Sequence, residues 1–178
     1  MKFDTGTELP DNFVLTKEFS DVYNLINDTN VNLFITGKAG SGKSTLLEYF
    51  RQNTNKNFVT LAFQGITAIK AKGQTLHSFF KFGPHFLAKE EIKLLKDKSL
   101  IQSLDTILID EISMVRADLF DAIDLSLKKN RKNNKPFGGV QMIVFGDVMQ
   151  IDPIVGSSDE EMMEKFYPKG RFFFNSNI

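Results

Sequence analysis

A glycine-rich segment at residues 37–44 contains the residue types that bind phosphate groups. Its sequence, GKAGSGKS, fits the pattern G-x-x-x-x-G-K-[S/T] at every fixed position. Glycines let backbone N–H groups turn toward phosphates, and a following helix N-terminus adds positive potential. We expect Lys43 to bridge the β- and γ-phosphates of a nucleotide and the Ser44 hydroxyl to bind Mg²⁺. The predicted nucleotide-binding residues are Gly37, Lys38, Ala39, Gly40, Ser41, Gly42, Lys43, Ser44 and Thr45. The strand and helix predicted on either side disfavour the alternative, a glycine-rich turn with an incidental lysine.

Two acidic residues, Asp110 and Glu111, close the apolar run TILID. Ligands of open α/β sheets bind at the carboxyl ends of the strands, so both acids are expected beside the phosphate loop. Asp110 is predicted to hold Mg²⁺, and Glu111 to orient and deprotonate an attacking water molecule. Taken alone, the pair would be interpreted as solvated acids at a strand end, and the upstream phosphate loop favours the catalytic interpretation.

Gln150 follows a further apolar run, QMIVF, within the segment GDVMQIDP. We expect this strand to lie next to the one that carries Asp110, which would bring Gln150 within reach of the γ-phosphate or the attacking water. An amide both donates and accepts hydrogen bonds, which suits this role. The alternative is a polar turn closed by Pro153. The predicted catalytic residues are Lys43, Glu111 and Gln150.

The elements that must position these residues alternate between strands and helices. Apolar runs predict strands at residues 31–36, 58–62, 106–110 and 141–145, with a possible fifth at 171–174. Helical spacing predicts helices at residues 17–27, 44–52 and 116–129. Two loops stand out, a charged insertion at 82–104 and a basic turn at 130–139. This alternation predicts an α/β fold with a mainly parallel sheet that is covered on both faces.

The whole chain has 178 residues, with 22 basic and 22 acidic side chains and no cysteine. This length favours a single domain spanning residues 1–178. Zero net charge gives no bulk attraction for nucleic acid, and the lack of cysteine excludes disulfides and thiolate metal sites. Residues 1–12 lack the apolar core of a signal peptide, and no apolar run is long enough to cross a membrane. We therefore expect a cytoplasmic protein with no membrane partner, associated with the nucleoid if the source is bacterial.

Four segments together resemble the N-terminal motor half of PIF-type DNA helicases, in the RecD-like group of superfamily one. They are LFITGKAGSGKSTLL, GITAIKAKGQTLHSFF, ILIDEISMV and PFGGVQMIVFGDVMQIDPI. The resemblance covers residues 13 to about 175. It implies a RecA-like P-loop NTPase domain, a three-layer αβα sandwich that uses ATP and Mg²⁺. It also implies a motor that moves 5′ to 3′ along single-stranded DNA and unwinds duplex or forked DNA in repair, recombination, replication or telomere maintenance.

The family's first single-strand segment falls on residues 63–68 and its second on 73–80. The DNA-binding candidates are Gln64, Gly65, Thr67, His77, Ser78 and Phe79. Considered singly, Phe79 and Phe80 favour a place in the core, and His77 favours a structural role. The family's second lobe contributes arginines to the γ-phosphate, and nothing after Gly156 resembles it. We therefore expect the second motor lobe to lie outside this chain.

Three positions depart from the family pattern. Phe19 stands where the family has a glutamine that reads adenine, so the resemblance does not imply selectivity for adenine. Phe63-Gln64 replaces proline-threonine in the first strand segment, and Asp152-Pro153 replaces a pair of prolines after Gln150.

Two other interpretations compete with a DNA motor. A P-loop ATPase or kinase acting on a protein or small molecule would share the phosphate loop, but not TLHSFF and GDxxQ. A nucleotide-binding module would bind ATP and hardly hydrolyse it. The basic run at residues 128–135 favours a solvated helix end over a DNA-binding patch.

Overall fold

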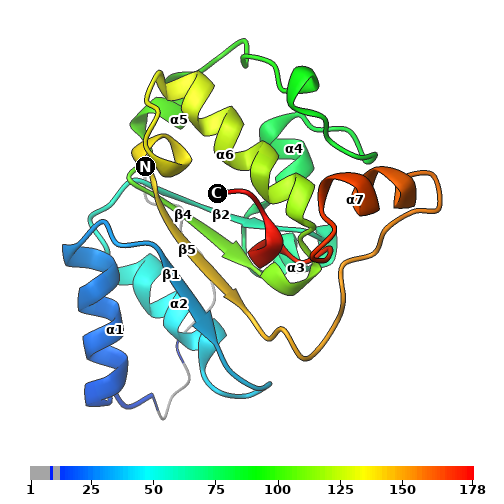
Figure 1. Cartoon of the computed structure of the whole chain (residues 1–178). Helices are drawn as coiled ribbons and strands as arrows, with labels where there is room; N and C mark the ends of the chain where they lie inside the picture. Colours follow the sequence, from blue (N-terminus) through cyan, green and yellow to red (C-terminus); the bar gives the residue numbers. More distant parts are fainter. Residues whose placement is uncertain (1–8, 10–12) are drawn as a thin grey trace.

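A five-stranded parallel sheet forms the centre of the structure, a computed structural model that describes residue 9 and residues 13–178. The strand order is β1-β5-β4-β2-β3, and all four neighbouring pairs are parallel (Figure 1). The strands are β1 (Leu33–Thr36), β2 (Phe58–Ala62), β3 (Gln74–Thr75), β4 (Thr106–Asp110) and β5 (Gln141–Gly146). The two central strands are almost wholly apolar and buried, as expected of parallel strands covered on both faces.

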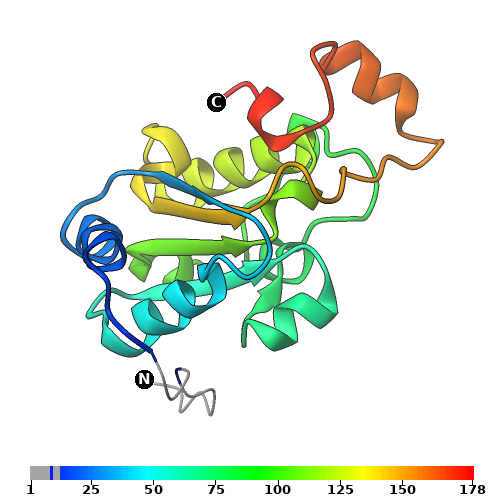
Figure 2. The same ribbon diagram turned by 90° about the horizontal axis from the view of Figure 1, so that it is seen from below.

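Helices cover both faces of this sheet, which gives three layers (Figure 2). On one face lie α1 (Lys17–Asp28) and α2 (Lys43–Asn53), whose Ile26 and Phe50 pack with Leu108 of β4. On the other face α6 (Ala117–Arg131) packs on Ile107 and Ile109 of the same strand. Successive side chains of a strand point to opposite faces, so one apolar strand supplies both cores. The predicted αβα sandwich is confirmed.

Shorter helices complete the chain. The α-helices are α3 (Gly65–Lys70), α4 (Leu76–Phe80), α5 (Ser99–Ser103) and α7 (Glu160–Phe166). The 3₁₀ turns are η1 (Lys89–Glu91), η2 (Ile112–Met114), η3 (Pro136–Gly139) and η4 (Phe173–Asn175). In the part of the chain that the structure describes, no helix is both long enough and apolar enough to span a bilayer.

The prediction of a fifth strand at residues 171–174 is wrong. Phe172 makes one isolated antiparallel bridge with Arg116, and the chain then turns into η4. Its aromatic side chains pack on α6, where Phe173 and Phe120 have ring centroids 5.6 Å apart. The fifth strand is the two-residue β3 instead, which precedes α4 at the sheet edge next to β2.

The basic end of α6 has a structural role. Lys128 forms an ion pair with Asp124 at 2.6 Å, and Lys129 donates to the carbonyl oxygen of Ile92 at 2.8 Å. Arg131 donates to carbonyl oxygens in the preceding loop, among them that of Leu104 at 3.0 Å. The contacts of Lys129 and Arg131 tie the insertion at residues 82–104 to α6.

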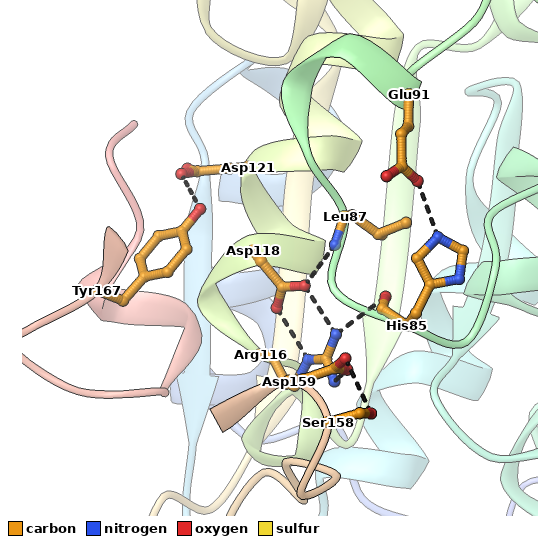
Figure 3. Close-up of polar contacts among 9 residues, drawn as sticks. All are labelled: His85, Leu87, Glu91, Arg116, Asp118, Asp121, Ser158, Asp159 and Tyr167. Carbon is orange, nitrogen blue, oxygen red and sulfur yellow. Dashed lines mark hydrogen bonds and ion pairs between the residues drawn. The ribbon is translucent and has the colours of Figure 1, made fainter. Parts of the chain in front are cut away.

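A buried ionic cluster joins three segments around Arg116 (Figure 3). The Arg116 guanidinium donates to Asp118 at 2.8 and 2.9 Å, to Asp159 at 3.0 Å and to the carbonyl oxygen of His85 at 3.2 Å. Asp118, fully buried, also accepts from the Leu87 N–H at 3.0 Å. Burial disfavours the guanidinium charge, but the hydrogen bonds and charges of Asp118 and Asp159 outweigh it and raise the pKa of Arg116. The cluster fixes the loop after β5 against the start of α6.

A second link holds the C-terminal segment to the same helix. The Tyr167 hydroxyl donates to Asp121 Oδ2 at 2.8 Å, and the Asn177 N–H donates to Asp121 Oδ1 at 2.9 Å. Burial, and then the hydrogen bond to Asp121, raise the pKa of Tyr167 far above its ordinary value. Tyr167 is therefore a fixed hydrogen-bond donor at physiological pH.

Candidate nucleotide and nucleic-acid site

The carboxyl ends of four adjacent strands meet at one edge of the sheet. In the parallel registers Thr36 pairs with Gly146, and Ala62 pairs with Asp110. The phosphate loop after β1, the acidic turn after β4 and the glutamine loop after β5 therefore leave the sheet side by side. This confirms that the strand before Gln150 lies next to the strand that carries Asp110.

The phosphate loop has the backbone conformation that its glycines predict. Gly40 and Gly42 have φ angles of 78° and 89°, in the left-handed region that side chains disfavour. At Gly37 a Cβ would lie 2.5 Å from Ser41 Oγ, so a larger residue there would displace the Ser41 hydroxyl. Gly42 caps α2, and Lys43 and Ser44 occupy its first turn. The Lys43 ammonium donates to the carbonyl oxygens of Gly37 and, at 3.0 Å, of Lys38.

One cavity of about 410 Å³ brings the predicted catalytic and metal-binding residues together. Its wall contains Lys43, Ser44, Asp110, Glu111 and Gln150. The other lining residues are Ala39, Gly40, Ser41, Gly42, Thr45, Ser113, Met114, Gly146, Asp147 and Ile151. Gly37 and Lys38 contribute to the loop through the backbone contacts to Lys43. Sequence reasoning missed Ser113 and Met114, because a 3₁₀ turn leaves no clear periodic signal.

The residues on this wall fit a Mg²⁺ ion bound together with a nucleotide. Mg²⁺ usually takes one or two protein oxygen ligands and completes its shell with phosphates and water. Ser44 offers a hydroxyl and Asp110 a carboxylate. Burial raises the pKa of Asp110, opposed by the Glu111 N–H that donates to its Oδ1 at 2.9 Å and by the charge of Lys43. A cation would relieve that desolvation. Among the described residues no group of three or more His, Cys, Asp or Glu gathers as in an all-protein metal site.

Glu111 turns out of the sheet in an unusual conformation. Its φ and ψ are 53° and 49°, the left-handed region, which costs a non-glycine residue about 1–3 kcal/mol. The conformation starts η2 directly after β4 and leaves the side chain exposed on the cavity wall. Glu111 Oε2 accepts a hydrogen bond from Thr67 Oγ1 at 3.1 Å.

Gln150 lies in an exposed turn after β5. Its N–H donates to the carbonyl oxygen of Asp147 at 3.1 Å, and the residue lines the cavity. Asp152, which stands in place of a family proline, is exposed to solvent. Its carboxylate can therefore stay hydrated, although it follows Gln150 of the proposed nucleotide site closely in the sequence.

The DNA-binding candidates separate into exposed and buried residues. Gln64, Gly65 and Ser78 are exposed at the starts of α3 and α4, and His77 is partly buried. Thr67 and Phe79 have exposed fractions of 9% and 7%. Burial does not support Thr67 and Phe79 as direct strand contacts, since Thr67 bonds Glu111 and Phe79 packs in the core. The core alternative is confirmed for Phe79 and Phe80.

A second cavity of about 430 Å³ lies beside these segments. Phe63 and His77, whose ring centroids are 5.7 Å apart, form part of its wall together with Arg116 and Asp159. Burial, and then the charge of Arg116, lower the pKa of His77, while Asp118 opposes this. His77 is therefore held in its neutral form.

Phe19 lies beside the phosphate loop. Its ring comes within 4.0 Å of the point where a Cβ of Gly42 would stand. It packs at the edges of Phe13 and Tyr49, with centroid distances of 5.3 and 5.9 Å. The position expected to read a base thus carries an aromatic ring, which offers stacking and no amide hydrogen bond.

Relatives of known function share this sequence over most of its length. The chain is 35% identical over 163 residues to the ATP-dependent DNA helicase RRM3 of Saccharomyces cerevisiae, an alignment that covers 86% of this chain and 22% of that protein. It is 39% identical over 152 residues to the ATP-dependent DNA helicase Pif1 of a Psychrobacter species, covering 78% and 22%. The chain thus spans about one fifth of the length of these relatives.

Solved structures show the same fold. The crystal structure of Bacteroides Pif1 bound to single-stranded DNA superposes with a TM-score of 0.84 at 39% identity, covering 93% of this chain and 39% of that one. The complex of Bacteroides Pif1 with ADP-AlF₃ and single-stranded DNA gives a TM-score of 0.85 at 40% identity, with the same coverage. A family model described as PIF1-like helicase matches residues 14–168. Since that match includes the phosphate loop, the acidic pair and Gln150, the chain belongs to the PIF1-like helicase family.

Proposed function

We propose that this chain forms the first lobe of an ATP-driven DNA helicase motor. The observation that carries the proposal is the single cavity that joins Lys43, Ser44, Asp110, Glu111 and Gln150. The two segments proposed to contact DNA follow β2 and β3 at the same edge of the sheet, and Thr67 in the first of them donates to Glu111 on the cavity wall. We infer that a second lobe, outside these 178 residues, closes over the nucleotide.

Each residue on the cavity wall has a separate role in the proposed hydrolysis of ATP. Lys43 neutralises charge on the β- and γ-phosphates, and the phosphate-loop N–H groups hold their oxygens. Ser44 and Asp110 would hold a Mg²⁺ ion, which would supply positive charge to the phosphates. Glu111 accepts a proton from the attacking water, and Gln150 orients that water or the γ-phosphate. The products are ADP and inorganic phosphate.

Single-stranded DNA is the proposed partner of residues 63–68 and 73–80, the two segments that match the family's DNA-contact segments. Exposed Gln64, Gly65 and Ser78 offer amide, backbone and hydroxyl groups that can bond phosphate. The zero net charge of the chain suits a motor that must release its track after each step. We also propose that the motor moves from 5′ to 3′ and acts on duplex or forked DNA in repair, recombination, replication or telomere maintenance. Its proposed location is the cytoplasm or the nucleoid.

ATP hydrolysis by the native protein, with and without single-stranded DNA, tests the proposal. Strong stimulation by DNA is the expected result, because the strand and nucleotide sites share one sheet edge. A native protein with a competent second lobe and no stimulation would be a P-loop ATPase that does not act on nucleic acid.

Residues 1–178 alone are expected to bind ATP and turn it over very slowly. Arginines contributed from outside a nucleotide site are worth about 10³–10⁵ in rate, and here they belong to the other lobe. Turnover of several ATP molecules per second by the isolated lobe would contradict the two-lobe proposal.

A further inference from the structure

We propose that Thr67 is a positioning residue for the Glu111 carboxylate and couples the strand segment at α3 to ATP hydrolysis. The proposal rests on the function proposed above and adds a residue that acts through Glu111. Thr67 Oγ1 donates to Glu111 Oε2 at 3.1 Å, between residues that are 44 positions apart in the sequence.

Sheet register brings these two residues together. Ala62 at the end of β2 pairs with Asp110 at the end of β4, so the segments that follow both strands run beside each other. Thr67 lies in α3, where the Ala71 N–H donates to its carbonyl oxygen at 2.8 Å. The donor is therefore fixed by a helix that packs on the sheet.

The Glu111 side chain has three rotatable bonds, and an unrestrained carboxylate would sample many orientations. Within residues 13–178 its carboxylate has one hydrogen bond, and Thr67 is the donor. A bond to an ionised acceptor is stronger than one between neutral groups. Thr67 thus occupies one lone pair of Oε2 and leaves Oε1 available to accept a proton from water.

Thr67 is better placed to transmit the presence of DNA than to contact it. It is 9% exposed, whereas Ile66 is 70% exposed and Gln64 and Gly65 are exposed beside it. The Ala68 N–H donates to the Gln64 carbonyl oxygen at 2.8 Å, so the exposed residues and Thr67 share one helical turn. A phosphate bound at Gln64 or Gly65 would move that turn and, through Thr67, the carboxylate of Glu111.

The test uses the native protein with Thr67→Val, which keeps the shape of the side chain and removes the hydroxyl. A correctly placed general base is worth about 10²–10⁴ in rate, so a misoriented one should lower the DNA-stimulated kcat by about tenfold or more. Three quantities should stay within about twofold of the wild type: KM for ATP, the affinity for a fluorescent ATP analogue, and the Kd for a labelled oligothymidine. The reason is that the proposed role of Thr67 involves contact with neither ligand. Thr67→Ser, which keeps the hydroxyl, should restore most of kcat.

Thr60→Val is the matched control, because it removes another buried hydroxyl from the strand that leads into α3. Thr60 is 3% exposed and accepts from Arg51 at 3.3 Å, away from Glu111. Its kcat should remain close to the wild-type value. Thr67→Ala gives a second truncation if the valine variant does not fold, as judged by thermal unfolding.

Two results would overturn the coupling role. One is a folded Thr67→Val protein with wild-type kcat and wild-type stimulation by DNA. The other is a loss of kcat that follows an equal loss of affinity for the oligothymidine, which would make Thr67 a strand contact. Failure of the proposed function is distinguishable, because the wild-type protein would then show no stimulation by DNA. The DNA-free kcat of the variant would still report whether Thr67 positions Glu111.

Discussion

Ala62 and Asp110 are partners in the parallel register of β2 and β4. After Ala62 the chain enters residues 63–68, the first segment proposed to contact DNA, and after Asp110 it enters the turn that begins with Glu111. The segment proposed to contact DNA and the proposed catalytic Glu111 therefore both begin one residue beyond a shared pair of the sheet.

Lys43→Ala should weaken ATP binding and lower hydrolysis by about 10²-fold or more, on the scale of losing one preorganised charge-stabilising group. The lysine is the cation of the loop whose ammonium already lies among loop carbonyl oxygens. Fluorescent-nucleotide titration and phosphate release would measure both effects. Lys135→Ala, in the loop before β5 and thus at the opposite end of that strand, removes the same charge and should change neither. Normal hydrolysis by Lys43→Ala would remove the residue from the mechanism.

Glu111→Gln should keep ATP binding and stop turnover, because an amide does not accept the proton of the attacking water. The glutamine retains the size of the side chain and still offers an oxygen to Thr67. Binding of a fluorescent ATP analogue, set beside single-turnover hydrolysis, separates the two effects. If binding were lost together with turnover, Glu111 would have a structural or metal-binding role.

His77→Gln should reduce the loss of stability on acidification. Burial and Arg116 lower the pKa of His77 below its ordinary 6.5, so the unfolded chain binds a proton more readily than the folded one. The stability that His77 contributes is present above about pH 6.5 and is lost as the pH falls toward the lower folded-state pKa. Urea unfolding between pH 8 and pH 5 would show a shallower decline for the variant. Parallel declines in both proteins would mean that protonated His77 is accommodated in the fold.

Arg116→Ala should destabilise the domain by about 3–5 kcal/mol, since it leaves the buried carboxylates of Asp118 and Asp159 without their cation. Glu91→Gln is the matched change at an exposed contact, where the Glu91 side chain is 49% exposed and its carboxylate contacts His85 (Figure 3). Exposed pairs contribute about 0–1 kcal/mol, so this control should unfold almost as the wild type does. Chemical denaturation of both variants gives the comparison, and equal small effects would show that the buried cluster relaxes around its loss.

ATP and GTP should bind with affinities within about tenfold of each other. Phe19 lies against the phosphate loop at the position expected to read the base, and its ring lacks the groups that hydrogen-bond a purine edge. Competition of both nucleotides against one fluorescent analogue measures the ratio, and Phe19→Gln should raise the preference for ATP. Strong ATP preference in the wild type would place base recognition elsewhere in the protein.

The fold class could be predicted from the sequence alone, and so could most of the residues that meet on the wall of the first cavity. The phosphate loop is a local structure, since Gly40, Gly42 and the start of α2 are set by neighbouring residues. The apolar, buried centres of β4 and β5 require cover on both faces, and this requirement favours a parallel sheet with helices on each side. The positions of Asp110 and Gln150 follow, because the ends of parallel strands lie at one edge.

Tertiary structure decided the features that depend on contacts between distant segments. Residues 171–174 have the aromatic composition of a strand, yet Phe173 packs on Phe120 of α6 and the segment does not join the sheet. The two-residue β3 is too short to give a periodic signal. From its residue type alone, Thr67 could have been a DNA contact. The register of β2 with β4 brings it close enough to Glu111 to donate a hydrogen bond to the carboxylate. Local chemistry selects the residues that can act, and non-local packing decides which of them meet.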